Sequence, residues 1–395
     1  MIITDVKINN LYCFDDFYVD FSYPRKVNSS TIDYEFLEER PNFNIKRFCV
    51  IMGSNSSGKT SFGKVLCGIE NFIVKKEITD LLKKGICDKT KNASFEVKFV
   101  TPYDLKFHSL YLEFNSDSVF PIKELTYKAV HILQNDSILS CKKRINAISQ
   151  DTRSKKAIYI SSVKYSILNA YDCFCKLKFK AEDWNFKLGN NNKEPELCDK
   201  VFYPSRALIE KILKSYDPSV NNVATFTAST KGTVEEYSVK FENGDSVRLN
   251  KNGEVLPEYL ARLSKGTSDA LHFISFIAHI LEQDSESCTY YLDDLLSSNS
   301  SEIEIDLINL MLSKLKNNSQ LFYTTHNNEV LNLNIPSHSF LFLSKKGNYV
   351  EAYQPEKMSF NKNDRTLFSY VKNNMFGTVP DTDRILEILL NENFK

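Results

Sequence analysis

The sequence predicts an α/β protein built around a parallel sheet, and three observations support that class. An apolar, β-prone segment at 47–52 runs into a glycine-containing loop at 53–60, which is followed at 61–72 by apolar residues at helical spacing. After residue 260, stretches of helical and strand character alternate, as they do where helices connect parallel strands. Residues 93–142 instead hold alternating β-branched and aromatic stretches, which indicate an antiparallel layer.

The remaining elements follow from the same patterns in chain order. Two short strands at 6–11 and 17–21 precede a polar, irregular stretch at 23–46. The later elements are strand 47–52, helix 59–75, strands 93–101, 106–114 and 122–133, a helix over 157–179, a loop at 187–193, a hairpin over 224–249 that turns at Asn243-Gly244, helix 268–281, strand 289–292, helix 301–315 and strand 320–324. No heptad array is visible, so we expect no long coiled-coil arm.

These elements divide the chain into three expected parts. Residues 1–92 and 256–395 form the two halves of one unit around the parallel sheet. Residues 93–255 interrupt that unit with the antiparallel layer and a mixed insertion that includes a helical subdomain.

Composition limits the classes of function. The 395 residues include 50 basic and 50 acidic ones, so the chain has no net positive charge to attract nucleic acid. Contact with nucleic acid would need a local patch of basic residues. No apolar run approaches the ~20 residues of a membrane span, and the N-terminus lacks signal-peptide character. Nine cysteines without a framework of spacings suggest reduced thiols. We therefore expect a cytoplasmic protein without a membrane partner.

The loop after strand 47–52 has the composition and spacing of a phosphate-binding loop. Gly53 and Gly58 allow the backbone dihedrals of a tight nest whose N–H groups face phosphates. Lys59 is placed to reach the β- and γ-phosphates of a nucleotide, and Thr60 to ligate Mg²⁺. The helix N-terminus adds a favourable dipole. The expected binding residues are Gly53, Ser54, Asn55, Ser56, Ser57, Gly58, Lys59, Thr60 and Ser61.

A second motif, Tyr290-Tyr-Leu-Asp-Asp294, ends an apolar strand in two carboxylates. The carboxyl end of a parallel strand lies beside the phosphate loop, so Asp293 is expected to hold the Mg²⁺ shell. Asp294 is expected to orient or deprotonate the attacking water. On its own, the same motif also fits a strand end followed by a solvated turn.

A third motif, Leu263-Ser-Lys-Gly-Thr-Ser-Asp269, opens a helix. Ser264, Gly266 and Thr267 present hydroxyl and backbone donors at the helix N-terminus, which is a second anion site. The alternative is a simple N-cap, with Thr267 or Ser268 as the capping residue.

A fourth motif, Leu321-Phe-Tyr-Thr-Thr-His-Asn327, delivers His326 at the end of a strand. A histidine in that position can bind the γ-phosphate or position the attacking water. A lone histidine is more often structural, and the chain has five others.

Together the four motifs resemble those of ATP-binding-cassette ATPases of the SMC, RecF and overcoming-lysogenization-defect type. The resemblance covers residues 1–75 and 255–380. It implies a head domain that binds ATP and Mg²⁺, with a Walker A loop at 53–60, a signature at 263–267, a Walker B strand at 289–294 and a switch histidine at 326. It also implies that two heads dimerise around two ATP molecules, so that Ser264 acts in trans while Lys59 acts in cis.

The resemblance has departures and open positions. Asp294 stands where the family has a catalytic glutamate, which implies slow or partner-gated hydrolysis. Either Gln134 or Gln150 is a candidate for the Q-loop, and either also fits a plain surface residue. Asn299 falls in the D-loop region, and Arg206 is either a family residue or a surface arginine. The tail at 370–380 also looks like the family's C-terminal segment.

The expected function is an ATPase that dimerises, or forms a higher oligomer, and controls a separate effector. We expect no nuclease domain after residue 395, so the resemblance points to ATPase subunits of bacterial anti-phage defence whose nuclease or toxin is another polypeptide. The alternative is a DNA-repair ATPase that contacts DNA directly. Its candidate basic clusters are 75–76, 83–84, 142–144 and 153–156. A transporter subunit ranks last.

Overall fold

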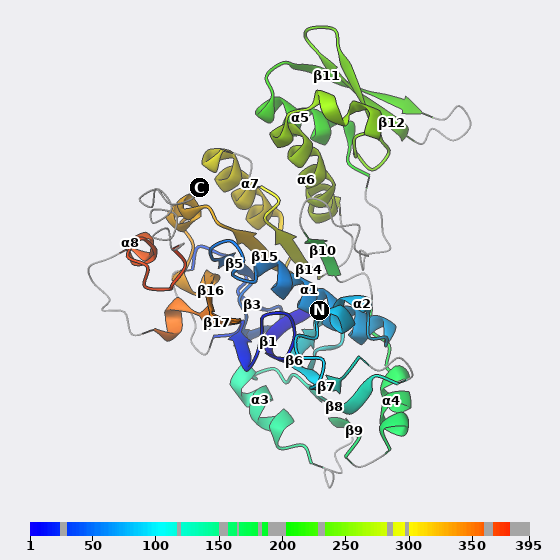
Figure 1. Cartoon of the computed structure of the whole chain (residues 1–395), viewed down its shortest axis with the longest axis vertical. Coiled ribbons are helices and arrows are strands. Elements are labelled where there is room, and N and C mark those ends of the chain that lie inside the picture. Colours follow the sequence, from blue (N-terminus) through cyan, green and yellow to red (C-terminus); the bar gives the residue numbers. More distant parts are fainter. Residues whose placement is uncertain are drawn as a thin grey trace, which may run out of the picture.

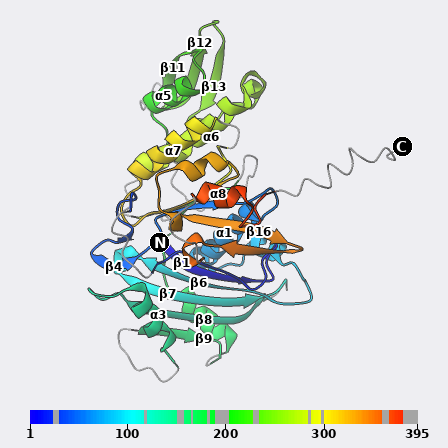
Figure 2. The same cartoon turned by 90° about the vertical axis from the view of Figure 1, so that its left-hand side faces the viewer.

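The computed structural model places two six-stranded sheets on either side of one buried helix (Figure 1). It describes residues 1–23, 30–116, 120–149, 157–163, 166–180, 184–188, 203–227, 234–282, 287–296, 300–358 and 366–379. Figure 2 shows the layers edge-on, with a separate lobe on one side of the parallel sheet and the antiparallel sheet on the other. The predicted α/β class, with a parallel core beside an antiparallel layer, is therefore confirmed.

The parallel sheet carries the predicted phosphate loop. Its strand order is β10 (Trp184–Leu188), β14 (Thr289–Asp293), β15 (Gln320–Thr325), β5 (Phe48–Met52), β16 (Phe340–Lys346) and β17 (Tyr349–Tyr353). The first five strands are parallel, and only β17 runs antiparallel, as the partner of β16 in a hairpin. Strands β5, β14 and β15 are buried along their whole length, which explains their continuous apolar runs. Their carboxyl ends meet at one edge.

The second sheet is entirely antiparallel. Its order is β2 (Phe17–Asp20), β1 (Ile2–Asn9), β6 (Ala93–Thr101), β7 (Lys106–Phe114), β8 (Ile122–His131) and β9 (Ala157–Ser161). One face packs on α1 (Lys59–Lys75) and α4 (Ile167–Cys175). The other face packs on α3 (Ile138–Asn146). Side chains alternate along these strands, so each face supplies its own apolar cluster.

Helix α1 lies between the two sheets and is buried on nearly every side. Phe62 contacts Phe14 and Phe17 of the antiparallel side, and Phe72 stacks on Phe174 of α4 with ring centroids 5.6 Å apart. Such burial on both flanks explains why the apolar residues of this helix are not confined to one stripe. The helix therefore starts at the phosphate loop from a rigid position.

A separate lobe holds α5 (Arg206–Tyr216) and a three-stranded antiparallel sheet (Figures 1 and 2). The strands are β11 (Val220–Thr227), β12 (Val234–Phe241) and β13 (Ser246–Asn250). The predicted hairpin turns at Gly244, whose φ of 88° suits glycine, but β11 adds a third strand. Helix α6 (Lys265–Glu282) connects this lobe to the core, where α7 (Ser301–Lys314) packs beside it.

Short elements complete the described chain. They are α2 (Asp80–Gly85), α8 (Leu367–Lys372) and the two-stranded ribbon of β3 (Phe36–Leu37) and β4 (Arg40–Asn44). The ribbon lies inside the stretch 23–46 that was expected to be irregular throughout, so that prediction was incomplete.

Two predicted elements were wrong. The helix expected over 157–179 is strand β9 followed by the shorter helix α4. The first five residues pair with β8, and pairing with an open sheet edge overrides a weak helical pattern. The loop expected at 187–193 starts too early, because Lys187 and Leu188 belong to β10 and pair with β14. Residues 189–193 lie outside the described residues.

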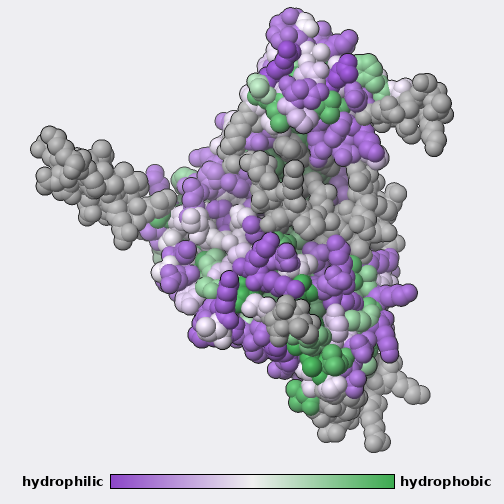
Figure 3. Space-filling view, turned by 45° about the vertical axis from the view of Figure 1, so that its right-hand side comes forward, coloured by the Kyte–Doolittle hydropathy of each residue, from purple (hydrophilic) through white to green (hydrophobic). Residues whose placement is uncertain are grey.

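The surface carries a local apolar patch. Figure 3 shows one face of the molecule, on which hydrophilic residues predominate and apolar ones gather over the lower, antiparallel part. Val163 and Leu168, beside β9 and on α4, are 71% and 56% exposed. Within the described residues, no helix combines the length and the apolar character needed to cross a bilayer.

The two sheets are joined by the buried side chain of Gln320, which gives a stability prediction. Its Oε1 accepts from the Ile3 amide at 2.9 Å, and its Nε2 donates to the carbonyls of Ile3 and Lys46, both at 3.0 Å. Replacing Gln320 with alanine leaves these buried groups unpaired, so we expect the free energy of unfolding to fall by about 2–4 kcal/mol. Urea unfolding measures the loss.

The matched control is Gln134→Ala, since Gln134 is exposed. We expect its urea midpoint to equal that of the wild type. A Gln320→Ala protein with an unchanged midpoint would show that the link between the sheets contributes nothing measurable.

Candidate functional site

The loop between β5 and α1 has a backbone that only glycine allows at two positions. A Cβ on Gly53 would lie 2.4 Å from Ser57 Oγ and 2.5 Å from the Leu343 carbonyl oxygen. Gly58 has a φ of 97°, and its Cβ would lie 3.0 Å from Cys13 Sγ. Gly58 is also the N-cap of α1, and no side chain caps that helix. The amide groups of the first turn therefore remain available to a ligand.

Lys59 lies folded over this loop. Its side chain is only 8% exposed, and its Nζ donates to the carbonyls of Gly53 at 2.7 Å and Ser54 at 3.2 Å. Burial lowers the pKa of Lys59, and the charges of Asp294 and Asp293 oppose that shift. Its hydrogen bonds go to neutral oxygens, so an anion entering the loop is a better partner than those it has.

Thr60 and Asp293 meet at the edge of the sheet. Thr60 Oγ1 donates to Asp293 Oδ2 at 2.7 Å, and Thr324 Oγ1 donates to Asp293 Oδ1, also at 2.7 Å. Asp293 is 2% exposed, and it pairs with Thr324 in the register of β14 and β15. A carboxylate and a hydroxyl 233 residues apart in sequence thus share one point in space.

Asp294 and His326 form a second pair beside the first. His326 Nδ1 lies 3.1 Å from Asp294 Oδ1. Burial raises the pKa of Asp294, and the charges of His326 and Lys59 oppose the rise. Asp294 has a φ of 49°, in the left-handed region, and its amide donates to Thr324 Oγ1 at 2.9 Å. Asp294 lines the same cavity as loop residues 55–61.

The signature residues lie in a different part of the chain. Ser264 is exposed and caps α6: its Oγ accepts from the Thr267 amide at 3.1 Å and lies 2.7 Å from Thr267 Oγ1. Thr267 is buried and Gly266 is half-buried. The capping residue is thus Ser264, whereas the sequence suggested Thr267 or Ser268. None of these residues lines the cavities described below, so the structure does not bring them to the loop within one chain.

Two cavities flank the phosphate loop. The larger, of about 590 Å³, runs along residues 55–61 and Asp294. Its outer wall is formed by Tyr12, Cys13, Cys87, Lys345 and Asn348. The sequence indicated none of these wall residues, because the hairpin of β16 and β17 that holds two of them was not predicted.

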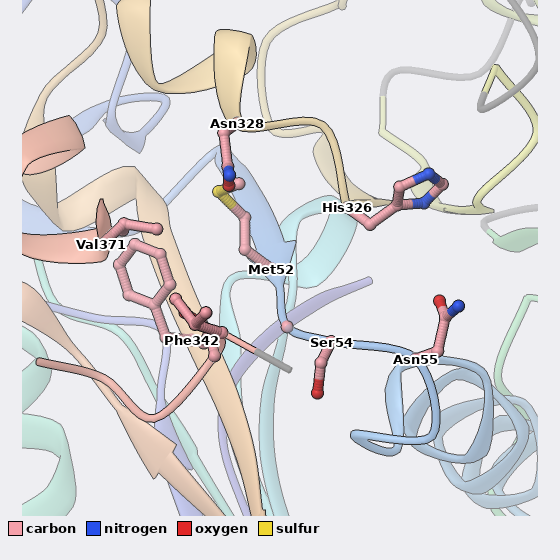
Figure 4. Close-up of a pocket in the computed structure, with 10 residues that line it drawn as sticks. Met52, Ser54, Asn55, His326, Asn328, Phe342 and Val371 are labelled. Atoms are coloured by element: carbon pink, nitrogen blue, oxygen red, sulfur yellow. The ribbon is translucent and has the colours of Figure 1, made fainter. Parts of the chain in front are cut away.

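The smaller cavity, of about 240 Å³, lies on the other side of the loop (Figure 4). Phe342 and Val371 lie close together on one side of it, and Asn55 and His326 lie on the other. The full lining is Met52, Gly53, Ser54, Asn55, His326, Asn328, Phe342, Val371, Thr378 and Val379. The C-terminal segment around α8 therefore contributes an apolar wall near the predicted switch histidine.

The structure places two of the four residues whose roles the sequence left undecided. Gln134 is exposed beyond the end of β8, and Arg206 starts α5 in the separate lobe, where it donates to the Val223 carbonyl at 3.2 Å. Gln150 and Asn299 lie outside the described residues. Neither Gln134 nor Arg206 lines a cavity at the loop.

The fold is that of an α/β protein in which a glycine-containing loop joins the buried strand β5 to helix α1. No protein-family model matches this sequence, and no curated protein does. Solved structures of SMC heads are similar to it in fold.

Three such structures illustrate the likeness. One is an SMC head bound to the C-terminal winged-helix domain of ScpA, with a TM-score of 0.47 and 12% identity over 90% of this chain and 99% of that one. The head domain from Thermotoga maritima has a TM-score of 0.38 and 11% identity, over 90% and 99% of the two chains. A head with an extended coiled coil, bound to the C-terminal domain of ScpA from Pyrococcus furiosus, has a TM-score of 0.47 and 10% identity, over 99% and 100%. At these values the likeness assigns no family.

Proposed function

We propose that this chain is an ATPase that binds ATP and Mg²⁺ at the loop 53–61 and hydrolyses ATP when two copies close over the nucleotide. The observation that carries the proposal is the 2.7 Å bond between Thr60 and Asp293. It joins the start of α1 to the acidic end of β14, which is the link that a metal–nucleotide site needs.

The residues at this point fit a magnesium ion. Mg²⁺ prefers hard oxygen ligands, and the Thr60 hydroxyl and Asp293 carboxylate supply two of them side by side. The Ser57 hydroxyl is a second indication that the loop holds a ligand, since this hydroxyl is buried in the loop without a hydrogen-bond partner. When bound, the ion neutralises charge on the β- and γ-phosphate oxygens.

The chain's own groups then have distinct tasks. Lys59 exchanges its two carbonyl partners for phosphate oxygens, and the uncapped amides of α1 bind the same anion. Asp294 accepts a proton from, or orients, the attacking water. His326 holds the Asp294 carboxylate in place through Nδ1.

A second copy is needed to complete the site. Ser264 lies at an exposed helix N-terminus outside the loop cavities of its own chain. Placed on the γ-phosphate of the other copy, this end of α6 adds donors and excludes water from the reaction. The proposed unit is thus a homodimer with two shared sites.

Mixing two inactive variants tests this arrangement. Ser264→Ala and Lys59→Ala proteins are each expected to lose ATP turnover. In a mixed dimer, one site combines Lys59 from one chain with Ser264 from the other and is intact. We therefore expect the equimolar mixture to recover about a quarter of wild-type turnover, as random pairing of a twofold dimer dictates. No recovery would mean that Ser264 does not act in trans.

The control separates this role from helix capping. Ser205 caps α5 in the same lobe by the same bond, with Oγ accepting from the Leu208 amide at 3.2 Å. Ser205→Ala should lose a cap worth about 1 kcal/mol and keep full turnover.

We also propose that ATP-driven closure controls a separate effector, a nuclease or toxin, in bacterial anti-phage defence. The support is the resemblance of the four motifs. An effector gene beside this one, and its co-purification with the ATP-bound dimer, test the proposal. A replication operon around the gene would instead favour a DNA-repair ATPase.

The basic cluster at 142–144 does not favour direct DNA binding. Lys142 pairs with Asp5 at 2.9 Å and with Asp20 at 3.1 Å, and Arg144 pairs with Asp136. These charges are engaged in ion pairs within the fold. The cluster at 153–156 lies outside the described residues.

A further inference from the structure

Glu304 is a buried carboxylate that lies behind the predicted switch histidine. It belongs to the first turns of α7 and is 1% exposed. Its Oε1 accepts from the Tyr323 hydroxyl at 2.5 Å and from Thr325 Oγ1 at 2.8 Å. Its Oε2 accepts from Asn327 Nδ2 at 2.7 Å. A buried carboxylate is costly unless its oxygens are paired, and here both are.

These contacts fix the chain on both sides of His326. Thr325 precedes it and Asn327 follows it, and both bond to Glu304. The backbone amide of Asn327 also donates to Thr325 Oγ1 at 3.0 Å. The side-chain Nδ2 of Asn327 lies 3.1 Å from Ser301 Oγ. The backbone around His326 is therefore tied to the start of α7, while its own side chain stays 49% exposed and reaches Asp294.

We propose that Glu304 is a positioning residue that holds His326 against Asp294. This inference rests on the proposed ATPase function and deepens it. Glu304 lines neither cavity at the loop, and it acts on His326 through Thr325 and Asn327. A side chain that must stay within hydrogen-bond reach of a base needs a rigid support, which a paired buried carboxylate supplies.

The substitution Glu304→Gln tests the support without changing the side-chain volume. In one orientation the new amide nitrogen faces Asn327 Nδ2, so that two donors meet. In the other it faces Tyr323 and Thr325, whose hydroxyl protons lose their acceptor. In either orientation, the anchoring of residues 325–327 to Glu304 weakens. We expect kcat to fall about 10-fold while KM for ATP stays within about twofold.

A reciprocal exchange supplies the rescue. Asn327→Asp alone places two carboxylates against each other and should also lower kcat. In Glu304→Gln/Asn327→Asp the amide and the carboxylate have changed places, so the donor and acceptor match again. We expect the double variant to recover to within about threefold of the wild type. A general loss of folding would not be reversed in this way.

The control is Glu302→Gln, an exposed residue in the same turn of α7. It undergoes the same change of charge and should keep the wild-type kcat. A Glu304→Gln enzyme with the same kcat as this control would overturn the proposal.

An NMR readout without nucleotide separates this inference from the ATPase proposal. The chain has six histidines, and the ring signal of His326 is assigned from its loss in His326→Gln. In the full chain, we expect Glu304→Gln to shift or broaden the His326 signal and the double variant to restore it. If the wild type does not hydrolyse ATP but this signal responds, the ATPase proposal fails and the positioning of His326 stands. An unchanged signal overturns the positioning, whatever the turnover.

Discussion

Replacing Lys59 with alanine is expected to weaken ATP binding by about 100-fold or more and to abolish turnover, because charge-assisted hydrogen bonds to phosphate are among the strongest polar contacts. Lys59 is the cation folded into the phosphate loop, 2.7 Å from the Gly53 carbonyl. Titration with a fluorescent ATP analogue measures the affinity. Lys64→Ala, on the same helix, is the control and should bind normally.

The same variant should not destabilise the protein without nucleotide. The pKa of Lys59 is lowered by burial, which means that the folded state disfavours the charged form. At neutral pH the ammonium therefore costs stability, and this cost offsets the loss of its bonds to the Gly53 and Ser54 carbonyls, so Lys59→Ala should melt close to the wild-type temperature. Nucleotide affinity equal to that of the wild type would refute the assignment of the loop.

Replacing Asp294 with asparagine is expected to slow turnover by about 100-fold or more while ATP still binds, since the loss of a general base costs that much. The nucleotide-bound dimer should then accumulate, and size-exclusion chromatography with ATP and Mg²⁺ should show it. Asparagine tolerates the φ of 49° at this position, so the backbone turn should be kept. Unchanged turnover would place the base elsewhere.

The pH dependence provides a second measurement on Asp294. Burial raises its pKa, so the base is lost to protonation at a higher pH than for an ordinary aspartate. Wild-type kcat/KM, which reports groups of the free enzyme, should fall as the pH drops through that raised value, and the residual kcat/KM of Asp294→Asn should lack this acid limb. Asp306→Asn, an exposed aspartate on α7, should keep the wild-type profile.

The sign for stability is the opposite of that for activity. A carboxyl whose pKa is higher in the folded state destabilises the fold above that pKa, and the cost disappears as the pH falls below the unfolded-state value. Asp294→Asn without nucleotide should therefore melt higher than the wild type at neutral pH and equally at acid pH. Thermal melts at two pH values decide this.

Local patterns predicted the core of the fold well. The strand, loop and helix at 47–75 are β5, the glycine loop and α1. The later strands at 289–292 and 320–324 are β14 and β15, correct to within a residue. Continuous apolar runs bounded by polar residues are strong signals, because a strand buried on both faces leaves few alternatives.

Other elements depended on partners that lie far away in sequence. The stretch 157–161 is a strand because the edge of β8 accepts it, although its own pattern suggested a helix. Glu304 gave no signal, since on α7 it is one of several acidic residues and its partners lie some twenty positions further on. The wall of the larger cavity also escaped prediction, because Tyr12 and Asn348 come from opposite ends of the chain.

The sequence by itself determined the identity of the chemical groups, because a glycine nest, its lysine and an acidic strand end are each encoded within a few neighbouring residues. Only the tertiary structure decided how these groups combine. Thr60 reaches Asp293 and Asp294 reaches His326 because neighbouring parallel strands end at one edge of the sheet. Ser264 stays apart from them because α6 begins in a separate lobe, and no local pattern encodes that separation.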